Sequence, residues 1–194
     1  MKREEVKDPV TAYFVSKGTA EKVAWDFVEK KKPGFTVTTL LPPLVYGPNE
    51  NFVNSTSSLN TSSANLYRIF SGSIKEIPPT TFPAMVDVRD LARAQLLAYE
   101  SEKAANQHYL ISAMSFDYQQ IADIIRKSFL ELRDTTPEGN PSEPLPEVFR
   151  VDNGKSIREL RMTYDTLEWT IVDSEKRIEE IKRNSLWVLF TVIL

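Results

Sequence analysis

Tyr13 and Lys17 stand four positions apart, just before and within a stretch that predicts a long helix over residues 15–31. Side chains four residues apart share one helical face, so the phenol and the ammonium can point the same way. A nearby cation stabilises tyrosinate and lowers the pKa of a tyrosine from its ordinary value near ~10. The pair is therefore a candidate proton donor and its partner, although surface pairs of these residue types are common.

The elements that follow would hold this pair beside the carboxyl edge of a sheet. We expect the helix to bury one apolar face and to stop at Pro33-Gly34. Residues 35–41 predict a strand that ends at Pro42-Pro43, and residues 44–48 predict a loop past its carboxyl end. Ligands bind at this edge in open α/β sheets. The expected buried face consists of Ala20, Val23, Ala24, Phe27 and Val28.

The remaining chain alternates between predicted helices and short strands. A polar loop over residues 49–63 is long enough to suggest a functional role. Asp87 and Asp117 are placed as helix N-caps. We expect strands near residues 84–86, 107–112 and 148–151, and helices over 64–70, 87–100, 117–129, 152–160 and 166–181.

Composition excludes several classes of function. The 194 residues carry a net charge of −3, which makes nucleic acid an unlikely partner. With no cysteine and one histidine, disulfides, thiolate catalysis and an ordinary zinc site are not expected. The charged N-terminus has no apolar core of a secretory signal, so we expect a cytoplasmic protein.

Four segments in a fixed order resemble a known family. They are residues 12–17 (AYFVSK, containing YxxxK), 42–48 (PPLVYGP), 59–62 (LNTS) and 86–92 (VDVRDLA). Together they resemble the extended short-chain dehydrogenase/reductases of the NAD-dependent epimerase/dehydratase superfamily. The subgroup most similar to this chain is the fungal aldehyde and ketone reductases of the methylglyoxal reductase type, with plant dihydroflavonol and cinnamoyl-CoA reductases more distant. YxxxK alone is a weak signal, but the ordered set is a strong one.

The resemblance implies an α/β fold that is only partly present. It predicts the C-terminal half of a doubly wound Rossmann-type parallel sheet and a small α/β substrate-binding lobe, with the first βαβ dinucleotide-binding half missing. Residues 1–112 would form the remainder of the catalytic and NAD(P)-binding domain, interleaved with segments of the substrate lobe. Residues 113–183 would supply mainly substrate-lobe helices, and residues 184–194 an apolar tail outside the fold.

The resemblance also implies roles for individual residues. Tyr13 would donate a proton to the carbonyl of a small aldehyde or ketone, while NADPH or NADH delivers hydride. Lys17 would bind the nicotinamide ribose and lower the pKa of Tyr13. Ser62 would reach toward a cofactor phosphate, and Phe52 and Val53 would help to wall the substrate pocket. The residues expected to pack on the nicotinamide are Pro42, Pro43, Leu44 and Val45.

The chain departs from the family pattern at the cofactor site. Its six glycines stand at 18, 34, 47, 72, 139 and 154, so a GxxGxxG turn that would approach the pyrophosphate is absent. Only twelve residues precede Tyr13, and they do not supply the serine that the family places on an upstream strand. We therefore expect negligible activity and weak NADPH affinity from this polypeptide alone.

Two alternatives to an active reductase remain. A non-catalytic paralogue could bind a full-length relative through the helix of Tyr13 to Lys31. Separately, the strand over residues 35–41 lacks its upstream neighbour, so we expect an open strand edge, marginal stability and a tendency to self-associate. The apolar run 186–194 could attach the chain to a membrane, but it is shorter than the ~20 residues that a spanning helix needs. We therefore expect no membrane partner.

Overall fold

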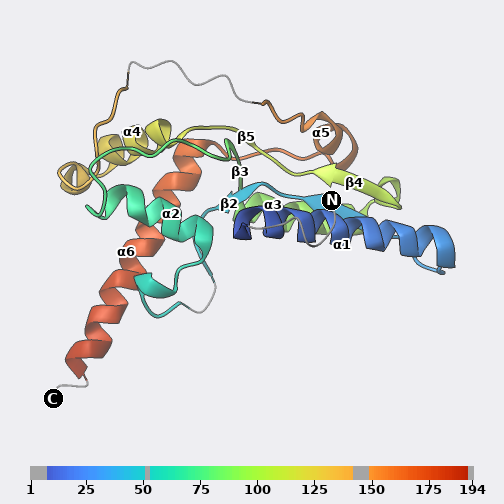
Figure 1. Cartoon of the computed structure of the whole chain (residues 1–194), viewed down its shortest axis with the longest axis horizontal. Coiled ribbons are helices and arrows are strands. Elements are labelled where there is room, and N and C mark those ends of the chain that lie inside the picture. Colours follow the sequence, from blue (N-terminus) through green and yellow to red (C-terminus); the bar gives the residue numbers. More distant parts are fainter. Residues whose placement is uncertain (1–7, 51–52, 142–148, 192–194) are drawn as a thin grey trace.

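The computed structural model describes residues 8–50, 53–141 and 149–191. It contains two small sheets, which lie one after the other along the long axis of the molecule (Figure 1). In the first sheet, β1 (Thr38–Leu41) pairs in parallel with β4 (Gln107–Leu110). In the second, β2 (Leu44–Tyr46) pairs in parallel with β3 (Ala84–Asp87), which pairs antiparallel with β5 (Met114–Ser115). The fold is α/β with parallel strands, as the sequence predicts.

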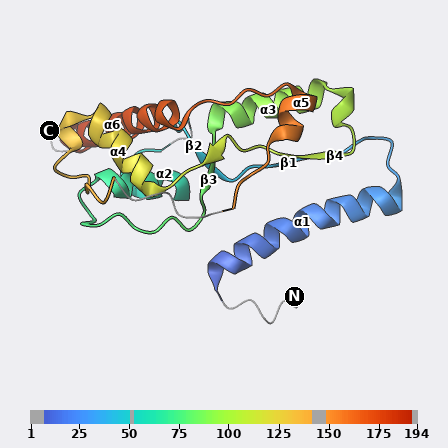
Figure 2. The ribbon, with the colours of Figure 1, turned by 90° about the horizontal axis from the view of Figure 1, so that it is seen from above.

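Helices flank the first sheet on opposite sides. Figure 2 shows α1 on one side of β1 and β4, with α3 and α5 on the other, which is the layering of a doubly wound fold. The helices are α1 (Pro9–Lys31), α2 (Thr61–Phe70), α3 (Val88–Glu100), α4 (Tyr118–Ser128), α5 (Gly154–Leu160) and α6 (Leu167–Thr191). Short 3₁₀ turns cover Thr56–Ser58, Glu102–Ala104 and Leu130–Leu132.

Side-chain caps explain where several helices begin. The carboxylate of Asp8 accepts hydrogen bonds from the backbone N–H groups of Val10 and Thr11, both at 3.0 Å, and Pro9 occupies the first turn. Helix α1 therefore starts six residues before the predicted residue 15, and Tyr13 lies within it. Asp87 and Asp117 cap α3 and α4, as predicted, and Asp117 forms a full capping box.

Two hydrophobic clusters hold the elements together. One joins α2, α4 and α6 through fully buried side chains such as Leu66, Ile121 and Ile171. The other packs α3 against the parallel strands, with Val86 and Tyr109 at its centre. Burial of such side chains stabilises a fold by about 1.5–3 kcal/mol each. The lobe around α4 and α6 therefore has a core of its own, separate from the core beneath α3.

The prediction that α1 buries an apolar face is wrong. No residue of this helix is buried, and Val23 and Phe27 are 59% and 47% exposed. Phe27 stacks on Phe35, with ring centroids 6.5 Å apart, and both rings remain in contact with solvent. Apolar residues at helical spacing predict that a helix has an apolar face. The spacing does not show whether other residues of the same polypeptide pack against that face.

Other boundaries also differ from the prediction. The strand predicted over residues 35–41 begins at Thr38, and the loop predicted over residues 44–48 contains strand β2. Pro42-Pro43 breaks the ladder, but the chain then changes neighbours, from β4 to β3, and resumes as a strand. Helix α6 continues ten residues past Ile181, and residues 149–151 contain no strand.

Candidate functional site

A pocket of about 560 Å³ lies between the start of α1, the double proline before β2, and the start of α2. It brings together six of the predicted site residues, namely Tyr13, Pro42, Pro43, Leu44, Val45 and Ser62. The other lining residues are Pro9, Val10, Phe14, Thr61, Asn65, Thr81, Phe82 and Tyr118. Residues far apart in the sequence thus meet around one opening beside the phenol of Tyr13.

Tyr13 and Lys17 share one face of α1. The Lys17 Nζ atom lies 5.4 Å from the centroid of the Tyr13 ring, and Tyr13 is 58% exposed at the pocket. Lys17 is exposed beside the pocket and does not line it. The hydroxyl of Ser16 donates to the backbone carbonyl of Tyr13 at 2.7 Å, so Ser16 is engaged with its own helix. The spacing seen in the sequence is therefore a real side-chain juxtaposition.

The wall formed by β2 is fixed at its far end by Gly47. Its φ of +120° suits glycine, and an added Cβ would lie 2.8 Å from Val88 Cγ1. The N–H of Gly47 donates to Ser174 Oγ at 2.8 Å, which ties the end of the strand to α6. Leu44 and Val45 line the pocket from a hydrogen-bonded strand, rather than from the predicted loop.

Ser62 lies in the first turn of α2. Asn60 caps this helix, since its side-chain oxygen accepts from the N–H of Ser63 at 2.9 Å. Thr61 and Ser62 thereby line the pocket at a helix N-terminus, where backbone N–H groups favour anions. Of the residues predicted to wall the substrate pocket, Val53 does not line it and Phe52 lies outside the described residues.

The sequence did not reveal the aromatic part of the pocket. Phe14 and Phe82 stack with ring centroids 5.9 Å apart, and Phe82 contacts Phe149 edge-on at 5.8 Å. Phe14 stands next to Tyr13 in the motif, which could have marked it. Phe82 follows an irregular proline-rich stretch, and its sequence context carried no signal.

The residues lining the pocket include no aspartate, glutamate, histidine, lysine or arginine. Burial raises the pKa of Tyr118 above its usual value, although the Tyr46 phenol and Arg68 oppose this shift. Burial also raises the pKa of Tyr46, with the Tyr118 phenol adding to the effect. Both phenols therefore keep their protons at neutral pH, and the pocket offers apolar surface with hydroxyl and amide groups.

A buried carboxylate behind the site joins β3 to α6. Asp87 is fully buried, and its carboxylate accepts hydrogen bonds from Arg89 Nη2 at 2.7 Å and from Thr170 Oγ1 at 2.8 Å. Arg89 Nη1 also contacts Asp173 at 2.7 Å. Burial opposes ionisation of Asp87, but hydrogen bonds from Arg89 and Thr170 hold its pKa below the usual value. We interpret Asp87 as a structural anchor that joins β3 to α6.

The part of the chain that the structure describes contains no group of three or more His, Cys, Asp or Glu side chains placed to hold a metal ion. None of the helices described in residues 8–50, 53–141 and 149–191 combines the length and apolar character needed to cross a bilayer.

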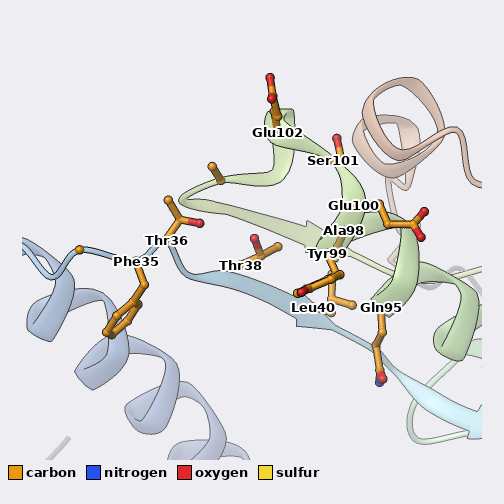
Figure 3. A pocket seen from close by; sticks show the side chains of 12 residues that line it. Phe35, Thr36, Thr38, Leu40, Gln95, Ala98, Tyr99, Glu100, Ser101 and Glu102 are labelled. Atoms are coloured by element: carbon orange, nitrogen blue, oxygen red, sulfur yellow. The ribbon is translucent and has the colours of Figure 1, made fainter.

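A larger groove of about 970 Å³ lies elsewhere, between β1 and α3 (Figure 3). It contains none of the predicted site residues. We assign the candidate active site to the smaller pocket, because a phenol, a neighbouring ammonium and a helix N-terminus converge there.

Comparison with known proteins identifies the family of the chain. The model of the NAD dependent epimerase/dehydratase family matches residues 1–112, which is more than half of the chain. The chain belongs to this family. The match spans Tyr13, Lys17, residues 42–45 and Ser62.

The family's reductases are similar over nearly the whole chain. The NADPH-dependent methylglyoxal reductase of Saccharomyces cerevisiae is 32% identical over 176 residues, which is 88% of this chain and 52% of that protein. A ketoreductase of Aspergillus niger is 36% identical over 174 residues, 88% of this chain and 52% of that protein. Yeast methylglyoxal/isovaleraldehyde reductase, solved with NADPH, gives a TM-score of 0.77 at 30% identity, covering 90% of this chain and 52% of that one. The chain thus spans about half the length of the relatives that it matches.

Proposed function

We propose that the chain carries the catalytic and substrate-binding half of an NADPH-dependent reductase of small aldehydes or ketones. The observation that supports this most directly is the convergence of Tyr13, with Lys17 beside it, on the pocket lined by residues 42–45 and Ser62. The activities named for the Saccharomyces cerevisiae and Aspergillus niger relatives are carbonyl reductions, and they support the same reaction class.

In the proposed reaction, the carbonyl oxygen of the substrate lies against the phenol of Tyr13. NADPH, when bound, supplies the hydride that adds to the carbonyl carbon. The Tyr13 O–H gives its proton to the oxygen, so the substrate becomes an alcohol. The Lys17 ammonium stabilises the negative charge that the phenol acquires, since it lies on the same helical face.

The described residues fit one end of the cofactor only. Pro42 to Val45 offer an apolar surface for a nicotinamide ring, and Ser62 lies at a helix N-terminus suited to a phosphate. The chain has no glycine-rich turn for the pyrophosphate. We therefore propose that NADPH binds weakly to this polypeptide alone, and that turnover requires the other half of the family fold.

The test compares the isolated chain with a completed protein. The completed protein joins the segment of the Saccharomyces cerevisiae reductase that lies upstream of the matched region to residues 1–194. We expect it to consume NADPH with methylglyoxal, and the isolated chain to show no consumption above the buffer blank. A completed protein that folds and binds NADPH without reducing methylglyoxal or a small ketone would contradict the reductase assignment.

The exposed apolar surface of α1 favours a second candidate, a non-catalytic subunit that binds a full-length relative. Val23 and Phe27 remain exposed along this helix and could pack against such a partner. Stable co-purification with a full-length reductase, unchanged by Tyr13→Phe, would favour this candidate. For either candidate we propose the cytoplasm as the compartment, because a chain without cysteine suits a reducing environment.

A further inference from the structure

A further pocket of about 270 Å³ adjoins the candidate active-site pocket, and we call it the side pocket. Asn65, Thr81 and Tyr118 line both cavities. The other residues that line the side pocket are Arg68, Ile69, Ile74, Pro78 and Pro79. Because three side chains are shared, a molecule bound beside Tyr13 has a second cavity next to it into which it can extend.

Arg68 gives the side pocket a positive charge. Its side chain is exposed, and the lining of the two pockets includes no aspartate or glutamate. Among the described residues, the Arg68 guanidinium forms no salt bridge and donates no hydrogen bond. A guanidinium in this state can bind a carboxylate through two parallel N–H···O hydrogen bonds.

The face of α2 that carries Arg68 connects the two pockets. Thr61, Asn65 and Arg68 follow one another at four- and three-residue spacing, which places them on one helical face. Thr61 lines the active-site pocket, Asn65 lines both pockets, and Arg68 lines the side pocket alone. At a rise of about 1.5 Å per residue, this face spans roughly 10 Å along the helix axis. An anion bound by Arg68 is therefore several atoms away from the group that lies beside Tyr13.

The remaining walls of the side pocket favour a carbon chain. Ile69, Ile74, Pro78 and Pro79 are apolar, and they suit the methylene groups that lead to a carboxylate better than a strongly hydrated phosphate. Asn65 adds an amide that forms no hydrogen bond within the part of the chain that the structure describes.

Tyr118 connects the charge of Arg68 with the active-site pocket. Burial raises the pKa of the Tyr118 phenol, and the positive charge of Arg68 opposes this rise. The guanidinium therefore acts on a side chain that lines both pockets. A negative group is favoured near this shared wall, and the lining supplies none.

We propose that the side pocket binds the carboxylate of an oxo acid whose carbonyl lies beside Tyr13, a placement that rests on the proposed reductase function. The Arg68 guanidinium pairs with the carboxylate, and the Asn65 amide donates a hydrogen bond to it. The carbon chain lies against the apolar walls. Hydride and proton add to the carbonyl as in the proposed reaction, and the carboxylate is unchanged. The substrate class is thus an oxo acid with several carbons between carbonyl and carboxylate.

The first test measures binding to the 194-residue chain, without cofactor or turnover. 5-Oxohexanoate and its methyl ester, which has the same carbonyl but no charge, are titrated while NMR follows the amide signals of α2. We expect the acid to bind at least tenfold more tightly than the ester, Arg68→Met to remove this difference, and Arg68→Lys to keep part of it. Arg183→Met is the matched control, because Arg183 is an exposed cation on α6 that lines neither pocket.

Three binding results would overturn the proposal. The first is an acid that binds no more tightly than its ester. The second is an equal loss of acid binding in Arg68→Met and Arg183→Met. The third is inorganic phosphate that binds more tightly than the acid and depends on Arg68, which would make the side pocket a phosphate site.

The second test uses turnover by the completed protein to separate this proposal from the reductase function. We expect Arg68→Met to lower kcat/KM for the acid at least tenfold and to leave kcat/KM for the ester unchanged. A preference for the acid that survives Arg68→Met would refute the carboxylate site and leave the reductase function standing. Binding of the acid that depends on Arg68, in a completed protein that reduces neither compound, would support the carboxylate site and contradict the reductase function.

Discussion

The proposed chemistry depends on the phenol of Tyr13 and the ammonium of Lys17 beside it. Their separation of 5.4 Å, measured from Nζ to the ring centroid, follows from helix geometry alone, because α1 is continuous from Pro9 to Lys31. Helix geometry does not explain why this face meets a pocket. That meeting depends on Asp8, whose cap starts the helix early, and on the double proline that turns the chain into β2.

Asp87→Asn should destabilise the fold by about 3 kcal/mol at neutral pH, because it removes a buried charge that Arg89 and Thr170 satisfy. The pKa of Asp87 is lower in the fold than its ordinary value of 3.8. Its contribution is therefore fully present above about pH 3.8 and is lost as the pH falls through the lower folded pKa. Urea unfolding of both proteins at pH 7 measures the difference.

Asp173→Asn is the control for this prediction. Asp173 contacts the same guanidinium but is partly exposed, so we expect a loss below 1 kcal/mol. Equal losses for the two variants would show that the buried position of Asp87 does not matter.

At the scale of elements, α1 is the most weakly attached helix. It contains no buried residue, and its polar contacts to the first sheet include the Glu21–Thr39 hydrogen bond. We predict that α1 amides exchange with solvent much faster than those of α3, whose Ala94 and Ala98 are buried. Hydrogen exchange of the intact chain measures this directly. Equal protection of α1 and α3 would mean that α1 is held by contacts that the structure does not show.

Helix α6 carries a buried carboxyl that makes stability depend on pH. Burial raises the pKa of Glu175 to about 7, and the neighbouring Glu179 and Glu131 add to the shift, while Lys176 and Lys182 oppose it. The unfolded carboxyl ionises near its ordinary value of 4.5, so the fold holds an extra proton between about pH 4.5 and 7. Stability should fall across this window as pH rises, by up to roughly 3 kcal/mol.

Glu175→Gln should remove most of this fall. Chemical denaturation at several values between pH 4.5 and 8 compares the two proteins, and their difference isolates Glu175 from other titrating groups. The exposed Glu180→Gln is the control and should leave the wild-type slope in place. If wild type and Glu175→Gln lose stability in parallel, Glu175 is ionised without cost in the fold.

The elements that could be predicted from sequence are those with local signals. The capping box of Asp117 and Gln120 lies at the start of α4, and the four-residue spacing of Ile121 and Ile125 indicates its buried face. The strand predicted over residues 107–112 is present as Gln107–Leu110, two residues shorter than predicted. The prediction failed where the outcome depends on distant neighbours. Nothing local shows that the chain after Pro43 pairs with β3, or that the apolar face of α1 lacks a cover.

The same distinction applies to the candidate site. YxxxK and the ordered segments indicated Tyr13, Lys17, Pro42 to Val45 and Ser62, and the structure places all of them except Lys17 around the pocket. The aromatic wall of Phe14 and Phe82 arises when the start of α1 meets a segment nearly seventy residues later in the sequence. A contact of this kind leaves no trace in either local sequence. The roles of these residues stay predictions.

At the scale of the whole molecule, the chain joins a well-packed lobe to an incomplete sheet. The lobe of α2, α4 and α6 has its own buried core, whereas β1 has a free edge and α1 an exposed apolar face. Such edges and faces promote association in solution. The described residues therefore combine a packed lobe with a strand edge and a helix face that they leave uncovered.

The most direct test of this account is NADPH consumption by the completed protein with and without the phenol of Tyr13. Tyr13→Phe removes the proposed proton donor and keeps the ring against the pocket, so we predict that kcat/KM for methylglyoxal falls by roughly 10²–10⁴-fold while NADPH binding stays unchanged. Leu96→Ala serves as the control and should retain full activity, because Leu96 is 64% exposed on α3 and lines neither the pocket nor the larger groove. A Tyr13→Phe protein that reduces methylglyoxal as fast as the unmutated completed protein would contradict the central claim.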